Sequence, residues 1–168
     1  MNWMKKVAVA LVCLLPLGLQ AAKIDTLQVK SPSMNKSIEV VVVSPDVAAT
    51  KACPVIYLLH GYGGNACTWV GIKPDLPKIA DEKGIFFVCP DGKNTWYWDS
   101  PLNADVRYET FISNELVKYV DSHYKTVADR KGRAITGLSM GGHGAMWNGL
   151  RHSDVFSAAG STSGGVDI

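Results

Sequence analysis

Short apolar runs, separated by turns and amphipathic segments, constrain the fold of this chain more than any other feature. Three of them lie at residues 54–59 (PVIYLL), 85–89 (IFFVC) and 133–138 (RAITGL). A short apolar run is typical of a strand that is buried on both faces of a parallel sheet. Because helical segments lie between the runs, they predict an α/β fold with a mostly parallel sheet.

Other segments complete the expected architecture. Further strands are predicted at 24–29, 37–43 and 156–161, the first two antiparallel in character and the last one buried. The spacing of apolar side chains predicts helices at 75–83, 109–123 and 140–152. No linker or change of composition interrupts residues 23–168, which we therefore expect to form one domain.

The first 22 residues have the three-part pattern of a secretory signal peptide. Lys5 and Lys6 precede an almost purely apolar stretch at 7–19, and the segment closes on the small residues Ala21 and Ala22. The apolar stretch is shorter than the roughly 20 residues that a membrane-spanning helix needs. We expect a secreted or periplasmic protein that has no membrane association once this segment is removed.

The charge balance argues against nucleic acid as a partner. The chain has 17 Lys and Arg residues, and the 15 that remain without Lys5 and Lys6 balance its 15 Asp and Glu residues. A neutral chain without a basic stripe lacks the electrostatic footprint of a protein that binds nucleic acid or anionic membranes. The sequence does not indicate an oligomeric state.

The cysteines allow one disulfide at most outside the leader. Cys53 and Cys67 could pair in an exported protein, whereas Cys89 ends an apolar run and is expected to be a small buried residue. No Cys-x-x-Cys motif or histidine cluster indicates a metal site.

A candidate nucleophile follows the third apolar run. Residues 137–141 read Gly-Leu-Ser-Met-Gly, a G-x-S-x-G motif placed between a predicted strand and a predicted helix. In that context the motif forms a sharp turn that exposes the serine hydroxyl in a strained backbone conformation. The flanking glycines are needed because strand and helix approach too closely for a Cβ atom, and the amino-terminus of the helix favours the negative charge that develops at Ser139. The alternative is that Ser139 only caps the helix.

A second glycine-rich turn, His60-Gly61-Tyr62-Gly63-Gly64, follows the first apolar run. Acyl transfer turns a carbonyl oxygen into an oxyanion, which needs two preorganised N–H donors. One donor comes from the residue after the nucleophile, here Met140, and the other from the loop after an earlier strand. Tyr62 is the preferred second donor, with Gly61 or Gly63 as alternatives. The competing interpretation is an ordinary glycine turn.

Three stretches of the chain, YLLHGYGGNACTW, VCPDGKNTWYWDSP and GLSMGGHGA, resemble the esterase D-like family of α/β-hydrolases. That family includes feruloyl and acetyl-xylan esterases, tributyrin esterases, S-formylglutathione hydrolases and mycolyltransferase antigens. The resemblance extends from about Ile24 to Ile168. It implies that Ser139 is the nucleophile, that Tyr62 and Met140 are the oxyanion donors, and that no metal or organic cofactor takes part.

The family pattern also requires an acid and a histidine after the nucleophile, in the order Ser, Asp or Glu, His. The residues after Ser139 suffice for about one helix, one loop and one strand, given typical element lengths. We therefore expect the chain to be the amino-terminal portion of an α/β-hydrolase domain, inactive by itself. His143 lies one helical turn past Ser139 and is poorly placed to act as its base, and His60 is expected to brace its own loop. His123 and His152 are expected at helix ends.

These features predict a secreted serine carboxylic ester hydrolase that works through an acyl-enzyme on Ser139. Export favours acetyl or feruloyl esters of carbohydrate as substrates, either small or linked to a polysaccharide. Trp96 and Trp98 lie in the irregular stretch at 90–106, after a strand end, where they could stack on a sugar or aryl ring or else pack into the core. Two alternatives remain: an acyltransferase of the same fold, and a catalytically inactive carbohydrate-binding remnant.

Overall fold

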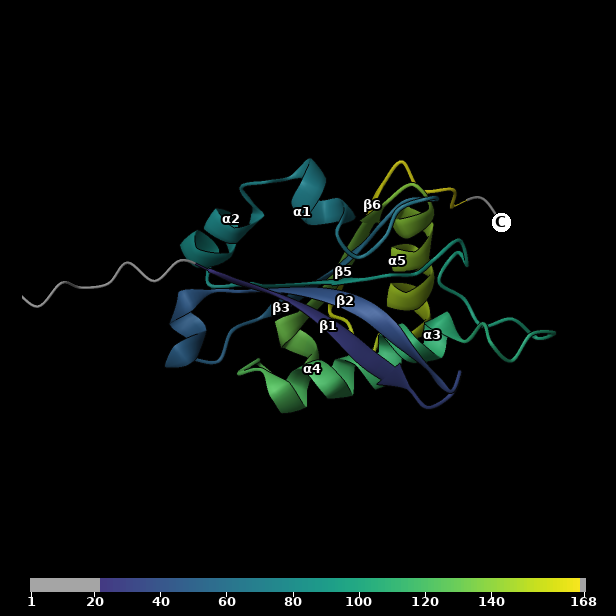
Figure 1. Cartoon of the computed structure of the whole chain (residues 1–168), viewed down its shortest axis with the longest axis horizontal. Helices are drawn as coiled ribbons and strands as arrows, with labels where there is room; N and C mark the ends of the chain where they lie inside the picture. The colour runs from purple at the N-terminus through teal and green to yellow at the C-terminus, as the bar shows by residue number, and fades with distance from the viewer. Residues whose placement is uncertain (1–21, 167–168) are drawn as a thin grey trace, which may run out of the picture.

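The computed structural model describes residues 22–166. The predicted signal peptide, apart from Ala22, lies outside these residues. A single six-stranded sheet crosses the molecule, with the spatial order β1-β2-β4-β3-β5-β6 (Figure 1). The strands are β1 (Lys23–Ser31), β2 (Lys36–Ser44), β3 (Val55–Leu59), β4 (Phe86–Pro90), β5 (Arg133–Leu138) and β6 (Ala158–Thr162).

The sheet is mixed, as expected. β1 pairs antiparallel with β2, and β2 pairs antiparallel with β4. The four strands β4, β3, β5 and β6 are parallel to one another. The carboxyl ends of these four strands therefore meet at one edge, which is where ligands bind in sheets of this kind.

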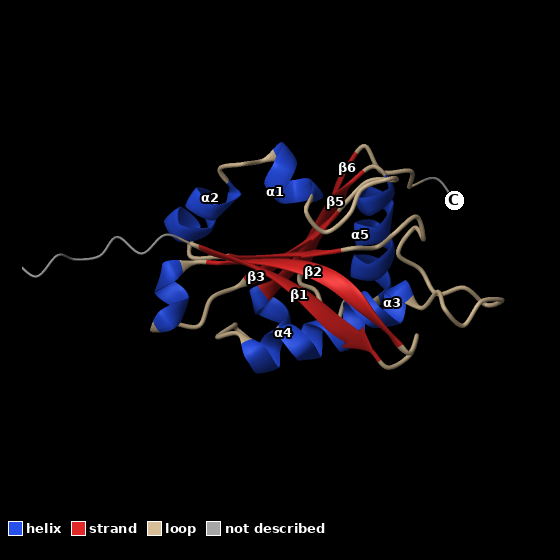
Figure 2. Ribbon diagram, in the orientation of Figure 1, coloured by secondary structure: helices blue, strands red, loops and turns tan. Residues whose placement is uncertain are grey.

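Helices cover both faces of the sheet (Figure 2). On one face lie α1 (Thr68–Ile72) and α2 (Leu76–Lys83), and on the other lie α4 (Val117–His123) and α5 (Met140–Arg151). α4 continues a helical run that starts with α3 (Tyr108–Thr110) and passes through the π-helical turn Phe111–Leu116. Short 3-10 turns stand at Asp46–Ala49 and Arg130–Gly132.

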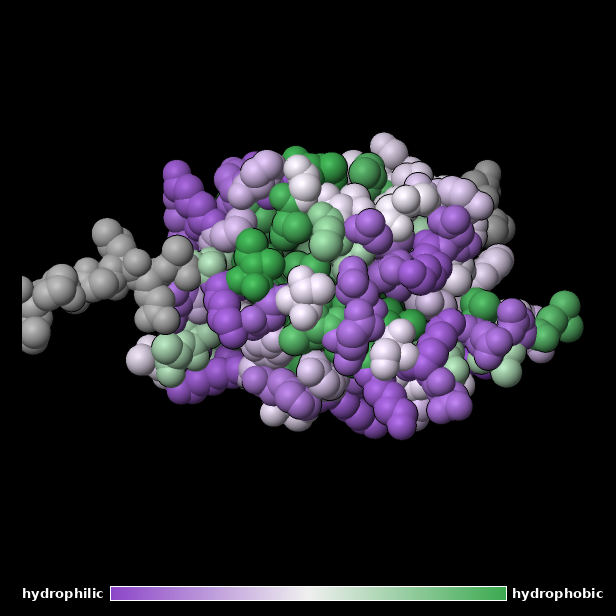
Figure 3. Space-filling view, viewed as in Figure 1, coloured by the Kyte–Doolittle hydropathy of each residue, from purple (hydrophilic) through white to green (hydrophobic). Residues whose placement is uncertain are grey.

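Two apolar clusters hold the layers together, and β2 contributes to both. Val40 and Val42 pack with the cluster that includes α4 and α5, whereas Val41 and Val43 pack against α2. Because successive side chains of a strand point to opposite faces, one valine run can serve two cores. Apolar residues also gather at the surface between the α1–α2 segment and the strands β1 and β2 (Figure 3).

Three features differ from the sequence predictions. The strand predicted as buried at 156–161 is β6, whose residues are mostly exposed because β5 is its only strand neighbour within residues 22–166. α1 has no counterpart in the prediction because five residues are too few to show a helical period. The π-helical turn was likewise not predicted, since its side-chain pattern resembles that of a helix.

The candidate disulfide is not formed. Cys53 is buried, Cys67 is exposed, and both are free thiols. Cys53 precedes β3 whereas Cys67 follows its far end, and a strand of this length spans roughly 16 Å at about 3.3 Å per residue. The α-carbons of a disulfide lie no more than about 7 Å apart, which explains why the pair does not form. Cys89 is buried, as predicted.

Among residues 22–166, no helix is both long enough and apolar enough to span a membrane.

Candidate active site

Ser139 occupies a sharp turn between β5 and α5. Its backbone has φ 54° and ψ −118°, a conformation that costs a residue with a side chain roughly 1–3 kcal/mol. Its N–H donates to the carbonyl of Thr162 at 2.8 Å, which fixes the turn to the end of β6. Ser139 stands at the N-cap position of α5, but its hydroxyl makes no capping hydrogen bond, so its side chain does not cap the helix. The geometry is that of a strained turn in which the serine hydroxyl is free of hydrogen bonds to the helix.

The flanking glycines are required by close backbone contacts. A Cβ atom on Gly141 would lie 2.2 Å from the carbonyl oxygen of Leu59, at the end of β3. One on Gly137 would lie 2.3 Å from the carbonyl oxygen of Gly141. Since real Cβ atoms do not approach a backbone this closely, the two glycines allow α5 to start directly against the sheet.

The glycine-rich loop after β3 lies against this turn. A Cβ atom on Gly61 would be 3.5 Å from the Cβ of Ser139. The N–H of Gly63 donates to Asn94 Oδ1 at 2.8 Å, and that of Gly64 donates to the Gly61 carbonyl at 3.0 Å. Gly63 therefore has a partner already, which leaves Tyr62 and Gly61 as the candidate donors. The ring of Tyr62 itself is exposed.

Met140 supplies the other candidate donor. It is the first residue of α5, and the first N–H groups of a helix have no partner within that helix. Its amide therefore lies next to the nucleophile, at the start of a helix whose dipole favours negative charge. The structure therefore places Met140 and Gly61 beside Ser139.

His60 braces the glycine-rich loop. Its side chain is buried, and Nδ1 donates to the carbonyl of Gly61 at 2.7 Å. Nε2 accepts the N–H of Gly92 at 2.9 Å, which requires a lone pair on that nitrogen. Both ring nitrogens therefore have partners in the backbone, and His60 holds the loop in place.

Asp91 and Lys93 lie beside this brace. The Asp91 carboxylate accepts from Lys93 Nζ at 2.6 Å and lies 3.5 Å from His60 Nε2. Burial opposes its ionisation, but the hydrogen bonds and charge of Lys93 outweigh burial and hold the pKa of Asp91 below its usual value. A hollow of about 360 Å³ opens next to this pair, lined by Gln28, Ser37, Ile38, Glu39, Asn65, Asp91 and Lys93.

Trp96, Tyr97 and Trp98 form an anchored loop near α5. Trp96 and Trp98 are 39% and 41% exposed, whereas Tyr97 is fully buried. The sequence left open whether Trp96 and Trp98 pack into the core or stack on a ligand; in the structure both rings are partly exposed, and Tyr97 between them packs inward. Trp96 and Trp98 meet the ring of His143 edge to face, at centroid distances of 5.3 and 6.2 Å.

His143 is buried among these aromatic rings and stacks on Trp147 at 6.1 Å. Its Nδ1 atom lies 2.8 Å from the carbonyl oxygen of Gly165. An apolar hollow of about 280 Å³ lies alongside, lined by His143, Met146, Trp147, Leu150 and Val166. As expected from its place on the helix, the His143 side chain makes no hydrogen bond to the Ser139 hydroxyl; only its backbone N–H donates to the Ser139 carbonyl, at 3.0 Å.

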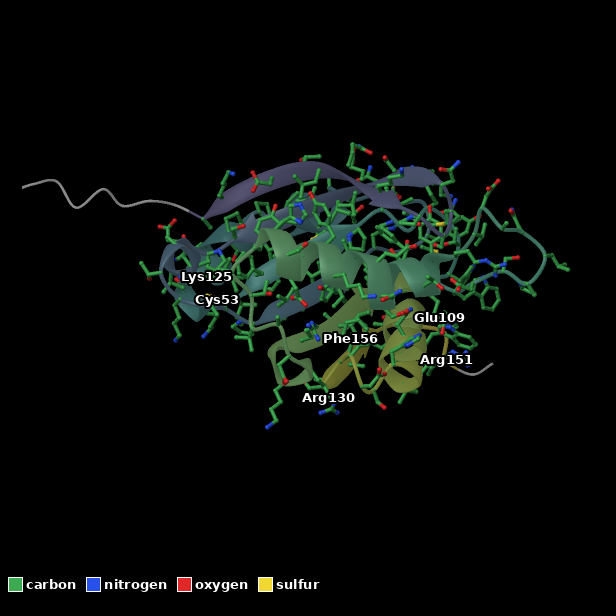
Figure 4. The ribbon with its side chains drawn as sticks, turned by 90° about the horizontal axis from the view of Figure 1, so that it is seen from below. Cys53, Glu109, Lys125, Arg130, Arg151 and Phe156 are labelled. Carbon is green, nitrogen blue, oxygen red and sulfur yellow. The ribbon has the colours of Figure 1, made fainter. Side chains whose placement is uncertain are left out.

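Glu109 is a buried residue that the sequence did not single out. Its carboxylate accepts from Trp147 Nε1 at 2.7 Å and Arg151 Nε at 2.8 Å, and lies 2.9 Å from His152 Nε2. Glu109 and Arg151 are directed toward one another in Figure 4. Burial disfavours the charged carboxylate, but hydrogen bonds from Arg151, Trp147 and His152 lower the pKa of Glu109. His152 is therefore paired rather than simply exposed at a helix end.

None of the four histidines hydrogen-bonds the Ser139 hydroxyl within residues 22–166. The remaining histidine, His123, stacks on Tyr119 at the end of α4. The same residues contain no group of three or more side chains suited to hold a metal ion.

A mostly parallel sheet, a strained serine between strand and helix, and a glycine-rich loop against that serine define the α/β-hydrolase fold. Residues 31–168 match the esterase family model, described as "Putative esterase". The chain therefore belongs to this esterase family, in agreement with its resemblance to the esterase D-like hydrolases.

Named relatives agree with this assignment. An acetyl esterase of Caldicellulosiruptor saccharolyticus is 32% identical over 102 residues, which cover 60% of this chain and 37% of that protein. An endo-1,4-beta-xylanase/feruloyl esterase of Xylanibacter ruminicola is 34% identical over 123 residues, which cover 67% of this chain and 17% of that protein. The solved structure of a ferulic acid esterase superimposes with a TM-score of 0.70 at 32% identity, covering 82% of this chain and 58% of that one. The chain spans less than two thirds of each relative.

Proposed function

We propose that this chain carries the nucleophile of a carboxylic ester hydrolase, and that the nucleophile is Ser139. The observation that carries the proposal is the strained backbone of Ser139, whose hydroxyl is uncommitted while glycine contacts hold the turn in place. Strain of this kind persists where the surrounding structure over-determines it, as it does at active sites.

The proposed reaction proceeds in two halves. Ser139 Oγ attacks the ester carbonyl, and its proton passes to a histidine base while the carbonyl oxygen becomes an oxyanion. The N–H groups of Met140 and Tyr62, with Gly61 as the alternative, hold that oxyanion, and each such donor contributes about 10²–10³ to the rate. The alcohol leaves with the proton, and water then releases the acid from Ser139. The described residues place no imidazole at Ser139, so the base has to come from elsewhere in the active protein.

Replacement of the nucleophile tests the proposal. In the protein expressed from its complete reading frame, Ser139→Ala is expected to lower kcat for p-nitrophenyl acetate by about 10⁴ or more. It should also abolish labelling by a fluorophosphonate probe. Ser122→Ala, which removes an exposed hydroxyl on α4, is the matched control and should change neither. Unchanged hydrolysis by Ser139→Ala would contradict the mechanism.

The favoured substrates are acetyl or feruloyl esters of carbohydrate. Support comes from relatives named acetyl esterase and feruloyl esterase, and from the exposed Trp96 and Trp98 beside an apolar hollow that suits an acyl group. The polar hollow beside Asp91 suits a hydroxyl-rich alcohol. Comparison of kcat/KM for methyl ferulate and for acetylated xylo-oligosaccharides separates the two acyl groups. Trp98→Ala should lower kcat/KM for the feruloyl ester more than for the acetyl ester.

A catalytically inactive carbohydrate-binding protein is the second candidate, favoured by the lack of an imidazole at Ser139 within the described residues. This candidate predicts affinity for xylo-oligosaccharides without fluorophosphonate labelling of Ser139. The esterase proposal predicts that labelling occurs.

We also propose that the protein is exported, on the basis of the leader pattern at 1–22. Export predicts a mature protein in the periplasm or the medium whose amino-terminus lies near Ala22. Amino-terminal sequencing of the protein recovered from those fractions is the test. An intact Met1 in the recovered protein would contradict export.

A further inference from the structure

Tyr97 joins three elements of the site through one buried side chain. Its hydroxyl donates to the carbonyl of His60 at 3.1 Å, in the loop after β3. Its own carbonyl accepts from Asn148 Nδ2 at 3.0 Å, on α5. Its ring fills the space that a Cβ atom would need at Gly92 and at Gly144, at distances of 2.1 and 2.5 Å. The loop after β3, the loop after β4 and the nucleophile helix therefore share this residue.

Two of these three elements carry the candidate oxyanion donors. The His60 carbonyl belongs to the peptide that leads into Gly61, so its orientation sets the direction of the chain toward Tyr62. α5 begins with Met140, one residue after the nucleophile. The hydroxyl of Tyr97 therefore holds one donor segment, while its backbone and ring hold the helix that begins with the other.

The backbone of the loop is strained at this position. Trp96 and Tyr97 have φ values of 58° and 62°, two consecutive left-handed residues with side chains. Such a conformation persists only where the surrounding contacts enforce it, and it is found at sites of function. Burial also raises the pKa of the Tyr97 hydroxyl well above its usual value, so the group stays protonated and remains a donor.

We propose that Tyr97 is a positioning residue that sets the relative placement of the two oxyanion donors by anchoring the His60 carbonyl to the nucleophile helix. This inference rests on the proposed esterase function. If Tyr97 positions the oxyanion donors, its loss should raise the energy of the transition state and leave substrate binding unchanged, because the oxyanion develops only as the transition state is reached. A residue that merely fills the core would affect stability alone.

Tyr97→Phe tests this role because it keeps the ring and removes only the donor. In the protein expressed from its complete reading frame, kcat for p-nitrophenyl acetate should fall about tenfold or more, with KM unchanged within about twofold. The affinity for phenylboronic acid, which forms a tetrahedral adduct with the serine, should fall by a similar factor. Tyr108→Phe is the matched control, since Tyr108 is also buried and its hydroxyl has no hydrogen-bond partner within residues 22–166.

The outcomes separate this inference from the esterase proposal. If wild type hydrolyses the ester and Tyr97→Phe retains its kcat while losing only thermal stability, Tyr97 is structural and the inference is wrong. If wild type and Ser139→Ala show the same hydrolysis, the esterase proposal fails. In that case the backbone amide resonances of Tyr62 and Met140 decide the inference. They should shift in Tyr97→Phe and remain in place in Tyr108→Phe, and unshifted resonances would overturn it.

Discussion

At the scale of single residues, glycines bring the elements of this site together. Gly137 and Gly141 remove the side chains that would hold α5 away from β3, and Gly61 lies directly against Ser139. The roles of Gly137 and Gly141 could be read from the sequence because the G-x-S-x-G spacing and the strand before it describe one local geometry. The conformation of Trp96 and Tyr97 could not, because left-handed residues with side chains are set by tertiary contacts rather than by residue type.

Gly141→Ala should be among the most damaging small substitutions in the chain. The added methyl group would stand 2.2 Å from the Leu59 carbonyl oxygen and 2.6 Å from that of His60, so a strand or a helix would have to move. We expect a loss of about 3 kcal/mol or more in the free energy of unfolding, measured by denaturant titration. Gly71→Ala is the matched control, because nothing lies near its Cβ position and alanine favours the helix by roughly 1 kcal/mol. Equal stability of the two variants would contradict the close contact.

At the scale of elements, the strands and the longer helices could be predicted from the sequence, whereas the contacts between them could not. Buried apolar runs located β3, β4 and β5 to within a residue or two, because burial on both faces leaves a local mark in sequence. Glu109 joins α3 to the last turn of α5 across 42 residues, and such a pairing leaves no local pattern. The candidate site could be predicted where it is local, at Ser139 and Met140, and not where its geometry depends on distant residues such as Tyr97.

Glu109→Gln should loosen the end of α5. The substitution removes the charge that strengthens the hydrogen bonds from Trp147 and Arg151, and we expect it to cost about 2 kcal/mol at pH 7. Because the folded state lowers the pKa of Glu109, the stability that its charge adds is fully present above its usual value of 4.5. That stability is lost as the pH falls through the lowered pKa. Chemical unfolding of wild type and Glu109→Gln at several pH values should show the two converging in acid.

The control for this prediction is Glu82→Gln. Glu82 forms an exposed pair with Lys78 at 3.6 Å, and such pairs contribute about 0–1 kcal/mol. Its effect should be small at neutral pH. A constant difference between wild type and Glu109→Gln from pH 7 to pH 3 would show that the carboxylate charge is not what stabilises the helix.

At the scale of the whole molecule, the two edges of the sheet differ in chemistry. β1 carries Lys23, Asp25 and Lys30, and charged side chains of this kind discourage pairing with another sheet. β6 reads Ala-Ala-Gly-Ser-Thr, has no charge, and is mostly exposed. Within the described residues, only β6 therefore offers an unprotected parallel edge.

We expect the 168-residue polypeptide, when expressed by itself, to aggregate through β6. Ala158→Lys should slow aggregation measured by light scattering, because a charge on an edge strand opposes strand addition. Thr26→Lys adds the same charge to β1 and serves as the control, since that edge already carries lysines. If both variants slowed aggregation equally, the cause would be the added net charge rather than protection of the β6 edge. A monodisperse wild-type sample with one sharp thermal transition would contradict the prediction altogether, because it would show that the β6 edge is stable in contact with water.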